Sequence, residues 1–180
     1  MVGTTVRDGA DLDRLHHPRP VVRLDGSRPA NPQEQGMSEN TTVINASTED
    51  VWSVLSDGWL YPLWVVGASR MRDVDEDWPA VGSRIHHSVG VWPGLIDDHT
   101  RVLAQEPQQS ITLCARAWPM GEAEVRITLT PAGDRTEVTI VEDAVSGPAL
   151  LVPGIARQPG LKWRNSETLR RLRLLVEGRS

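Results

Sequence analysis

The segment VINASTEDVWSVLSDGWLYPLW, residues 43–64, decides the fold of this chain. It opens on a short apolar strand, after which Ser47 stands three residues before Asp50, the spacing of a helix-starting capping box. A second, shorter helical piece follows over 59–64 and is interrupted by Pro62, which cannot continue a helix hydrogen-bond ladder. The segment therefore predicts one strand followed by two short helices.

Beyond this segment the apolar period changes from helical to twofold, with turn residues between the runs, which is typical of antiparallel strands. After a connection rich in Pro and Gly, Leu161 to Glu177 has one apolar face and predicts a long C-terminal helix. The predicted strands cover 42–45, 66–75, 81–91, 95–105, 110–118, 122–130 and 135–145, and the predicted helices cover 47–56, 59–64 and 161–177.

Residues 1–36 differ from the rest of the chain. They contain four Pro and few apolar residues without a period, so we expect a disordered tail. A globular ligand-binding domain is predicted over 37–180, and Met37 is a candidate for the true translation start.

Composition excludes several classes of protein. The 180 residues carry a net charge of −5, which argues against nucleic-acid binding as the main activity. The lone Cys114 excludes an intramolecular disulfide framework. No apolar run approaches the roughly 20 residues of a membrane span, and no secretory signal is evident, so we expect a cytoplasmic protein without integral membrane contact. The sequence does not determine the oligomeric state.

Pairing the strands through their turns keeps one apolar face continuous across the sheet. The pairing sets His87 opposite Thr100, Val102 opposite Leu113, Ala115 opposite Val125, and Ile127 opposite Ile140. One end of this inner face is bulky and apolar. The other end consists of two rows of small or polar residues, His87–Thr100–Ala115–Val125–Glu142 and Val89–Asp98–Ala117–Ala123–Ala144. A concave space with a few polar groups on apolar walls is the usual form of a small-molecule site.

His87 is the main candidate for chemistry at this hollow end. It lies diagonal to Asp98 in the predicted pairing, and a carboxylate could orient the imidazole as a general acid or base. Glu142 is a second candidate acid or base, or a group that orients a ligand hydroxyl. The alternatives are that His87 is a buried structural histidine and that Glu142 reaches solvent at a strand end.

Metal and cofactor sites are not predicted. His86 and His87 point to opposite faces of their strand and cannot chelate one ion together, and a site built from His86 and His99 alone would be weak. The dinucleotide, P-loop and nucleophile-elbow motifs are absent. We therefore expect no metal and no cofactor.

Seven Trp, one Tyr and no Phe make an unusual aromatic inventory. The indoles lie in the helical segments and at strand ends, so they either fill the core or surround a pocket opening and stack on a ring-containing ligand. The candidate ligand-binding residues are Trp59, Trp64, Val89, Thr100, Ala115, Ala117, Ala123, Val125, Trp163 and Asn165.

The order of strand, two short helices, six-stranded meander and long C-terminal helix resembles the START/Bet v 1-like (SRPBCC) superfamily, in its polyketide cyclase/dehydrase-like branch. The likeness rests on residues 43–64, on GSRIHHSV at 82–89 and on RNSETLRRLRLLVE at 164–177, and it covers about 37–180. It implies an α+β helix-grip fold, in which a curved antiparallel sheet wraps around the C-terminal helix and encloses a hydrophobic cavity. No residue set matches a particular cyclase, so the resemblance assigns no catalytic residues.

The leading hypothesis is a protein that binds a small hydrophobic, ring-containing ligand, either a lipid or a polyketide-like compound, between the sheet and the C-terminal helix. One alternative is a polyketide cyclase or dehydratase in which His87 acts as a base and Asp98 orients it. A second alternative is an interaction module without a ligand, which would use the basic C-terminal helix, since 159–180 carry six Lys/Arg against two Glu.

Overall fold

A computed structural model describes residues 37–179 except 91, 118–120 and 152–153. The predicted tail, Trp118 and the last residue lie outside the described residues. The elements, in chain order, are β1 (Ser38–Ile44), α1 (Thr48–Leu55), η1 (Gly58–Leu60), α2 (Tyr61–Trp64), β2 (Ala68–Val74), β3 (Arg84–Val89), β4 (Ile96–Glu106), β5 (Ser110–Ala117), β6 (Gly121–Ala132), β7 (Arg135–Ser146), η2 (Pro148–Leu151) and α3 (Gly154–Glu177).

The predicted capping box starts α1. The backbone N–H of Asp50 donates to Oγ of Ser47 over 3.1 Å, and the backbone N–H of Ser47 donates to Oδ2 of Asp50 over 3.2 Å. These bonds satisfy two donors that a helix start otherwise leaves unpaired. Pro62 stands in the first turn of α2, where a backbone N–H has no partner within the helix, so its absence breaks no helical hydrogen bond. Residues 43–64 therefore form a strand followed by short helices, as predicted.

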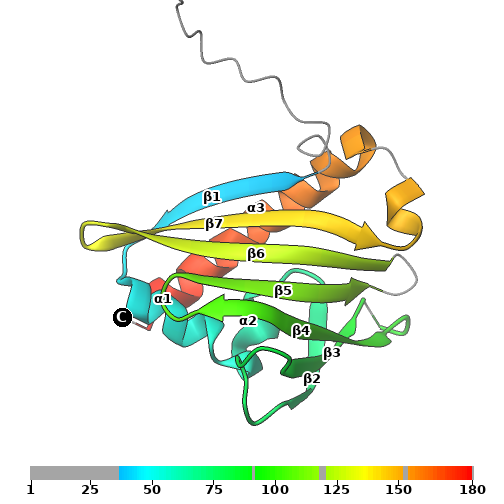
Figure 1. The fold of residues 1–180 in the computed structure, drawn as a ribbon, viewed down its shortest axis with the longest axis horizontal. Helices are drawn as coiled ribbons and strands as arrows, with labels where there is room; N and C mark the ends of the chain where they lie inside the picture. The colour runs from blue at the N-terminus through cyan, green and yellow to red at the C-terminus, as the bar shows by residue number, and fades with distance from the viewer. Residues whose placement is uncertain (1–36, 91, 118–120, 152–153, 180) are drawn as a thin grey trace, which may run out of the picture.

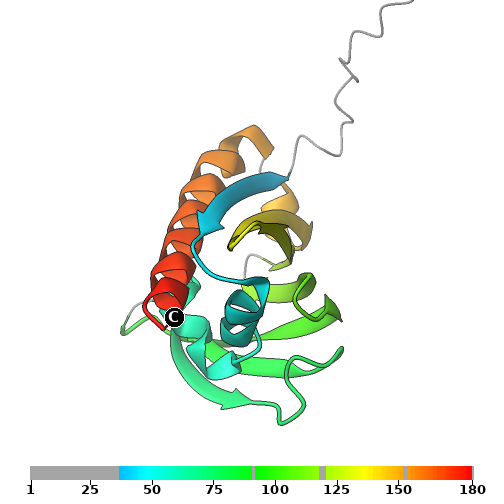
Figure 2. The same cartoon turned by 90° about the vertical axis from the view of Figure 1, so that its left-hand side faces the viewer.

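The strands form one antiparallel sheet in the order β1-β7-β6-β5-β4-β3-β2 (Figure 1). Helix α3 runs along one face of this sheet, and the sheet curves around it (Figure 2). The α+β helix-grip arrangement is confirmed. None of the helices in the described part of the chain is long and apolar enough to cross a membrane.

The predicted register is correct at two of the four hairpins. Val102 pairs with Leu113, and Ile127 pairs with Ile140. The other two hairpins are shifted by two residues, so that Asp98 rather than Thr100 pairs with His87, and Ala123 rather than Val125 pairs with Ala115. A shift of two residues leaves every side chain on its predicted face, because side chains alternate with period two.

Two elements begin earlier than predicted. Strand β1 begins at Ser38 because its polar residues are used in pairing: Asn40 also donates through Nδ2 to the carbonyl of Lys162 (3.1 Å) and to Oγ of Ser166 (2.8 Å) in α3. Helix α3 begins at Gly154 and continues through Pro159, although the Pro/Gly-rich segment predicted a loop. A proline inside a helix removes one backbone N–H and crowds the carbonyl four residues earlier, but the helix continues on both sides of Pro159.

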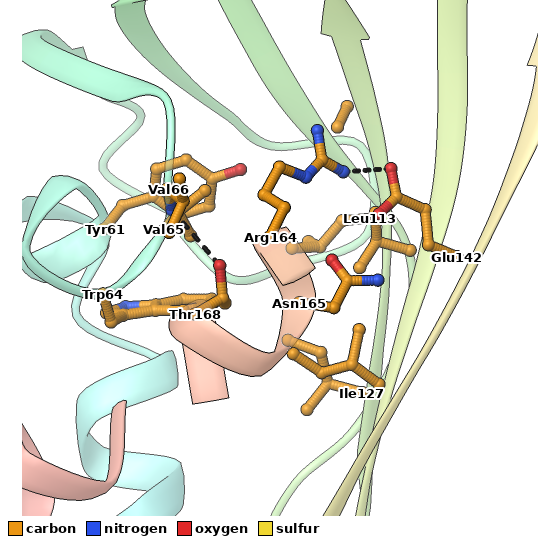
Figure 3. A pocket seen from close by; sticks show the side chains of 13 residues that line it. Tyr61, Trp64, Val65, Val66, Leu113, Ile127, Glu142, Arg164, Asn165 and Thr168 are labelled. Atoms are coloured by element: carbon orange, nitrogen blue, oxygen red, sulfur yellow. Dashed lines mark hydrogen bonds and ion pairs between the residues drawn. The ribbon is translucent and has the colours of Figure 1, made fainter. Parts of the chain in front are cut away.

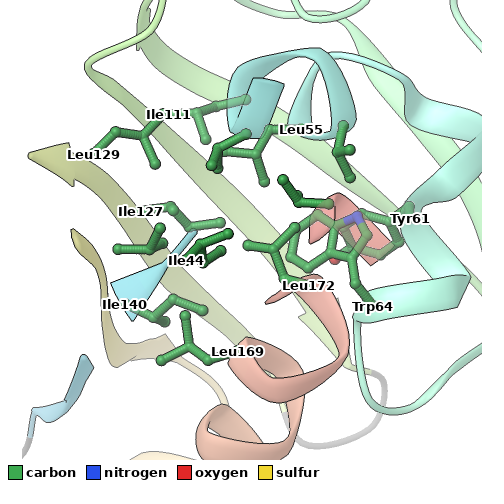
Figure 4. Close-up of a cluster of buried hydrophobic side chains, with 14 of the residues drawn as sticks. Ile44, Leu55, Tyr61, Trp64, Ile111, Ile127, Leu129, Ile140, Leu169 and Leu172 are labelled. Atoms are coloured by element: carbon green, nitrogen blue, oxygen red, sulfur yellow. The ribbon is translucent and has the colours of Figure 1, made fainter. Parts of the chain in front are cut away.

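The core lies between the apolar end of the sheet and the helices (Figure 4). The side chains of Leu169, Leu172 and Val176 come from α3 and are almost completely buried. The sheet and its neighbours contribute Ile44, Val51, Val54, Leu55, Ile85, Val102, Ile111, Ile127, Leu129, Val138 and Ile140. The inner face predicted by the twofold period is the buried face of the sheet.

Candidate functional site

A cavity of about 70 Å³ lies between the sheet, α2 and the middle of α3 (Figure 3). Its apolar walls come from β5, β6 and β7 on one side and from the segment after α2 on the other. The lining residues are Tyr61, Trp64, Val65, Val66, Leu113, Ala115, Val125, Ile127, Ile140, Glu142, Arg164, Asn165 and Thr168.

Two aromatic rings form the wall contributed by α2. Tyr61 and Trp64 are both buried, and their ring centroids lie 5.3 Å apart with planes inclined by 70°. This edge-to-face arrangement is a favourable one for aromatic pairs. The walls are therefore aromatic on one side and aliphatic on the other.

A buried ion pair crosses one side of this cavity. Glu142 is on the inner face of β7, where its neighbours across the sheet are Val125 and Ser38, and it is only 3% exposed. Arg164 reaches it from α3 and donates through Nη2 to Oε1 of Glu142 (Figure 3). The other carboxylate oxygen, Oε2, has no hydrogen-bond partner among the described residues.

Asn165, the next residue of α3, is also 3% exposed, and its amide Nδ2 has no partner within the described part of the chain. Buried polar atoms without partners are uncommon in folded proteins, because each one loses its bond to water and gains nothing in return. We call Glu142, Arg164 and Asn165 the polar cluster. It combines one acid, one base and one amide in an otherwise apolar cavity.

A chain of hydrogen bonds leads away from the cavity behind Tyr61. The Tyr61 hydroxyl lies 3.2 Å from Oγ1 of Thr100, and Nε2 of His87 lies 3.0 Å from the same oxygen. Burial raises the pKa of Tyr61, although the bond to Thr100 opposes this. Burial lowers the pKa of His87, although the nearby Asp98 carboxylate opposes this. At neutral pH both rings are therefore uncharged.

The predicted partnership of His87 and Asp98 takes a different form in the structure. The two residues are directly opposite each other in the register of β3 and β4, and both are buried. Asp98 accepts a hydrogen bond from the backbone N–H of His99 over 2.8 Å, and its Oδ1 lies 3.9 Å from Nε of Arg116. Asp98 thus acts on His87 mainly through its charge.

The structure places five of the thirteen residues that sequence reasoning proposed for ligand binding and catalysis on the cavity wall. Those that line it are Trp64, Ala115, Val125, Glu142 and Asn165. Those that do not are Trp59, His87, Val89, Asp98, Thr100, Ala123 and Trp163. The side chain of Ala117 lies outside the described part of the chain. Thr100 and His87 connect to the cavity through Tyr61, whereas Trp59 and Trp163 are 57% and 68% exposed.

Sequence reasoning missed Tyr61 and Arg164. Arg164 could have been found from Glu142, because a carboxylate predicted to lie on a buried sheet face requires a cationic partner, and Arg164 precedes the inward-facing Asn165. Tyr61 carried a weaker signal, as the single tyrosine in a chain without phenylalanine. No group of three or more His, Cys, Asp or Glu placed to hold a metal ion occurs among the described residues.

Comparison with known families gives one match. The family model described as polyketide cyclase/dehydrase and lipid transport matches residues 35–177. This range contains every described element and the whole cavity. A search of curated proteins finds no match.

Solved structures share the fold. Protein CV1439 from Chromobacterium violaceum is 21% identical with a TM-score of 0.57, over 78% of this chain and 97% of that one. The di-domain ARO/CYC StfQ from the steffimycin biosynthetic pathway is 13% identical with a TM-score of 0.63, over 80% of this chain and 51% of StfQ. DynU16 from the dynemicin biosynthetic locus is 20% identical with a TM-score of 0.55, over 79% of this chain and 48% of that one. At these identities the likeness shows the fold alone.

Proposed function

This chain belongs to the polyketide cyclase/dehydrase and lipid transport family, and we propose that it binds a small, largely apolar, ring-containing ligand in the cavity between the sheet and α3. The observation that carries the proposal is the cavity itself, which has aromatic and aliphatic walls and one buried polar cluster. A few polar groups fixed on apolar walls allow a protein to bind a hydrophobic body and to orient it.

The size of the cavity supports a compact ligand. At about 70 Å³ it is smaller than the roughly 300–1,000 Å³ of a site for a drug-sized molecule. A larger ligand needs one wall of the cavity to move. One or two fused rings match this space better than an extended acyl chain does.

The flat surfaces of Tyr61 and Trp64 support a ring rather than a chain. Two buried aromatic side chains on one wall offer stacking and edge contacts to a planar ligand. Two proteins of similar fold, StfQ and DynU16, are named after steffimycin and dynemicin biosynthesis. A polyketide-like aromatic compound therefore fits both the family and the walls.

Binding can be tested with N-phenyl-1-naphthylamine, a neutral probe with a naphthalene and a phenyl ring that fluoresces in apolar surroundings. We expect a saturable fluorescence increase with one site per chain. Ala115→Leu should abolish it by filling the cavity, because Ala115 lines that space. Thr128→Leu is the matched control, since it adds a leucine on the exposed outer face of β6. A silent wild-type protein, or equal binding by Ala115→Leu, would contradict the proposal and favour an interaction module.

A second candidate function is cyclisation or dehydration of a polyketide-like substrate. The observation that favours it is the hydrogen-bonded chain from the cavity through Tyr61 and Thr100 to His87. His87 is uncharged at neutral pH and could serve as the base of that chain, with the nearby Asp98 stabilising its protonated form.

The two functions can be separated with His87→Ala and a poly-β-ketoacyl N-acetylcysteamine thioester as substrate. If the protein is an enzyme, the variant loses turnover while the affinity for the naphthylamine probe survives. If the protein only binds, neither the wild type nor the variant turns the thioester over faster than buffer does.

A further inference from the structure

The polar cluster carries no net charge, because its buried acid, Glu142, is paired with the partly exposed base Arg164. We infer that it selects ligands whose polar group is neutral and presents both a hydrogen-bond donor and an acceptor, such as an amide or a hydroxy-ketone, and that it rejects carboxylates. This inference rests on the proposed function, since it concerns the same cavity.

Glu142 already uses the one cation of the cavity wall. Among the described lining residues, Glu142 and Arg164 are the only acid and base, and they are bonded to each other. An entering carboxylate would either displace Glu142 from Arg164 or share the guanidinium with it. Displacement leaves Glu142 as a buried carboxylate without a partner, and sharing places two negative charges around one positive charge. A fatty acid is therefore a poor ligand for this cavity.

Two unpartnered atoms define what the ligand group should offer. Oε2 of Glu142 can only accept a hydrogen bond, and Nδ2 of Asn165 can only donate one. Both side chains are more than nine-tenths buried, so water does not satisfy them from outside. Figure 3 shows the Asn165 amide beside the Arg164–Glu142 pair, pointing toward the same strands. A ligand with one donor and one acceptor can satisfy both atoms while the ion pair stays intact.

A matched pair of probes separates charge from shape. 2-Naphthamide and 2-naphthoate have the same rings and nearly the same outline, but the first is neutral and has a donor and an acceptor, whereas the second is an anion. At pH 7.5 we expect calorimetry to give at least tenfold tighter binding of 2-naphthamide to the wild-type protein. Equal affinities, or tighter binding of the naphthoate, would overturn the inference.

Two variants should move this preference in opposite directions. Glu142→Gln leaves Arg164 without its counter-charge, so the ratio of the two dissociation constants should shift at least tenfold toward 2-naphthoate. Arg164→Gln leaves Glu142 as a lone acid, so the ratio should shift further toward 2-naphthamide. Shifts in the same direction, or no shift in either variant, would contradict the assigned role of the pair.

The control variant is Glu124→Gln, which makes the same chemical change in a solvent-exposed ion pair with Arg126 on the outer face. It should leave the ratio unchanged, and a shift equal to that of Glu142→Gln would contradict the inference. Circular dichroism confirms folding of each variant, and the wild-type preference stands as a test even if Glu142→Gln fails to fold. If Ala115→Leu abolishes binding of the naphthylamine probe but the wild-type protein binds 2-naphthamide and 2-naphthoate equally, only the inferred selection against charge fails. If no probe binds, the proposed function fails with it.

Discussion

The two ends of the inner face of the sheet share strands and a covering helix but differ in side-chain volume and polarity. The closed end is built from buried aliphatic residues, namely Ile111, Leu129 and Val138, and Ile127 and Ile140 lie between it and the cavity. At the hollow end the residues are smaller or polar, namely His87, Asp98, Thr100, Ala115, Ala123 and Glu142. The same strands run through both ends, so the side chains and the helical segments that cover them distinguish the filled end from the end that leaves a cavity.

Helix α3 makes the same division along its length. Leu172 and Val176 of its C-terminal half pack on the closed end with their side chains almost fully buried. Arg164 and Asn165, two turns earlier, face the cavity. Buried packing is therefore concentrated at one end of the helix and the proposed binding site at the other, which predicts that mutations at the two ends have different consequences.

The largest effect should come from Leu172→Ala at the closed end. Truncating a fully buried leucine removes its transfer free energy and leaves a cavity, so we expect the free energy of unfolding to fall by about 2–5 kcal/mol. Urea denaturation followed by circular dichroism measures this. The affinity for the naphthylamine probe should be unchanged under conditions where the variant is folded. A loss below 1 kcal/mol would mean that the closed end is not the stabilising part of the molecule.

Much of this comparison could be predicted from the sequence, because it depends on periodicity. Alternation predicted which residues of the strands face inward, and these faces are correct even where the register was wrong by two residues. The exception is the irregularity after Val102 in β4, beyond which Ala104 pairs with Thr112 and is exposed. The register errors occur at the β3–β4 and β5–β6 hairpins, where the paired residues are two residues closer together in the sequence than predicted. Loop geometry depends on turn conformation, which residue types constrain only weakly.

The composition of the site was harder to predict than the fold. Glu142, Ala115 and Val125 were found from strand faces alone, and they line the cavity. Arg164 and Tyr61 were missed because they lie on helices whose rotation and distance relative to the sheet are set by packing, not by local sequence. The exposed positions of Trp59 and Trp163 have the same cause: an aromatic residue in a helical segment can face either way.

A second prediction makes the same change, valine to leucine, at each end of the inner face. Val138 and Val125 lie on neighbouring strands, but Val138 is fully buried at the closed end and Val125 lines the cavity. Val138→Leu should cost about 1–3 kcal/mol, because an extra methylene must be forced into a packed core. Val125→Leu should change the free energy of unfolding by less than about 0.5 kcal/mol, because the cavity accepts the added group. Equal costs, measured by urea denaturation, would mean that the cavity is closed in solution.

The smallest expected effect is the dependence of the free energy of unfolding on pH, which should come from the hollow end rather than the closed end. Burial holds the pKa of His87 below its usual value in the folded protein, whereas in the unfolded chain it titrates near 6.5. As the pH falls through about 6.5, His87 becomes protonated in the unfolded chain but not yet in the folded protein. The free energy of unfolding is therefore higher above this pH and decreases below it. One proton bounds the slope at about 1.4 kcal/mol per pH unit.

Urea denaturation at pH 7.5 and pH 5.5 tests this, and His87→Gln should flatten the dependence. It should not remove it completely, because the pKa of His99 is also lowered, by partial burial and by Arg84. Leu172→Ala is the matched control: it removes stability from the closed end, where no histidine contributes, and should keep the full wild-type slope. If His87→Gln retains that slope as well, protonation of the hollow end is not what couples the stability of this fold to pH.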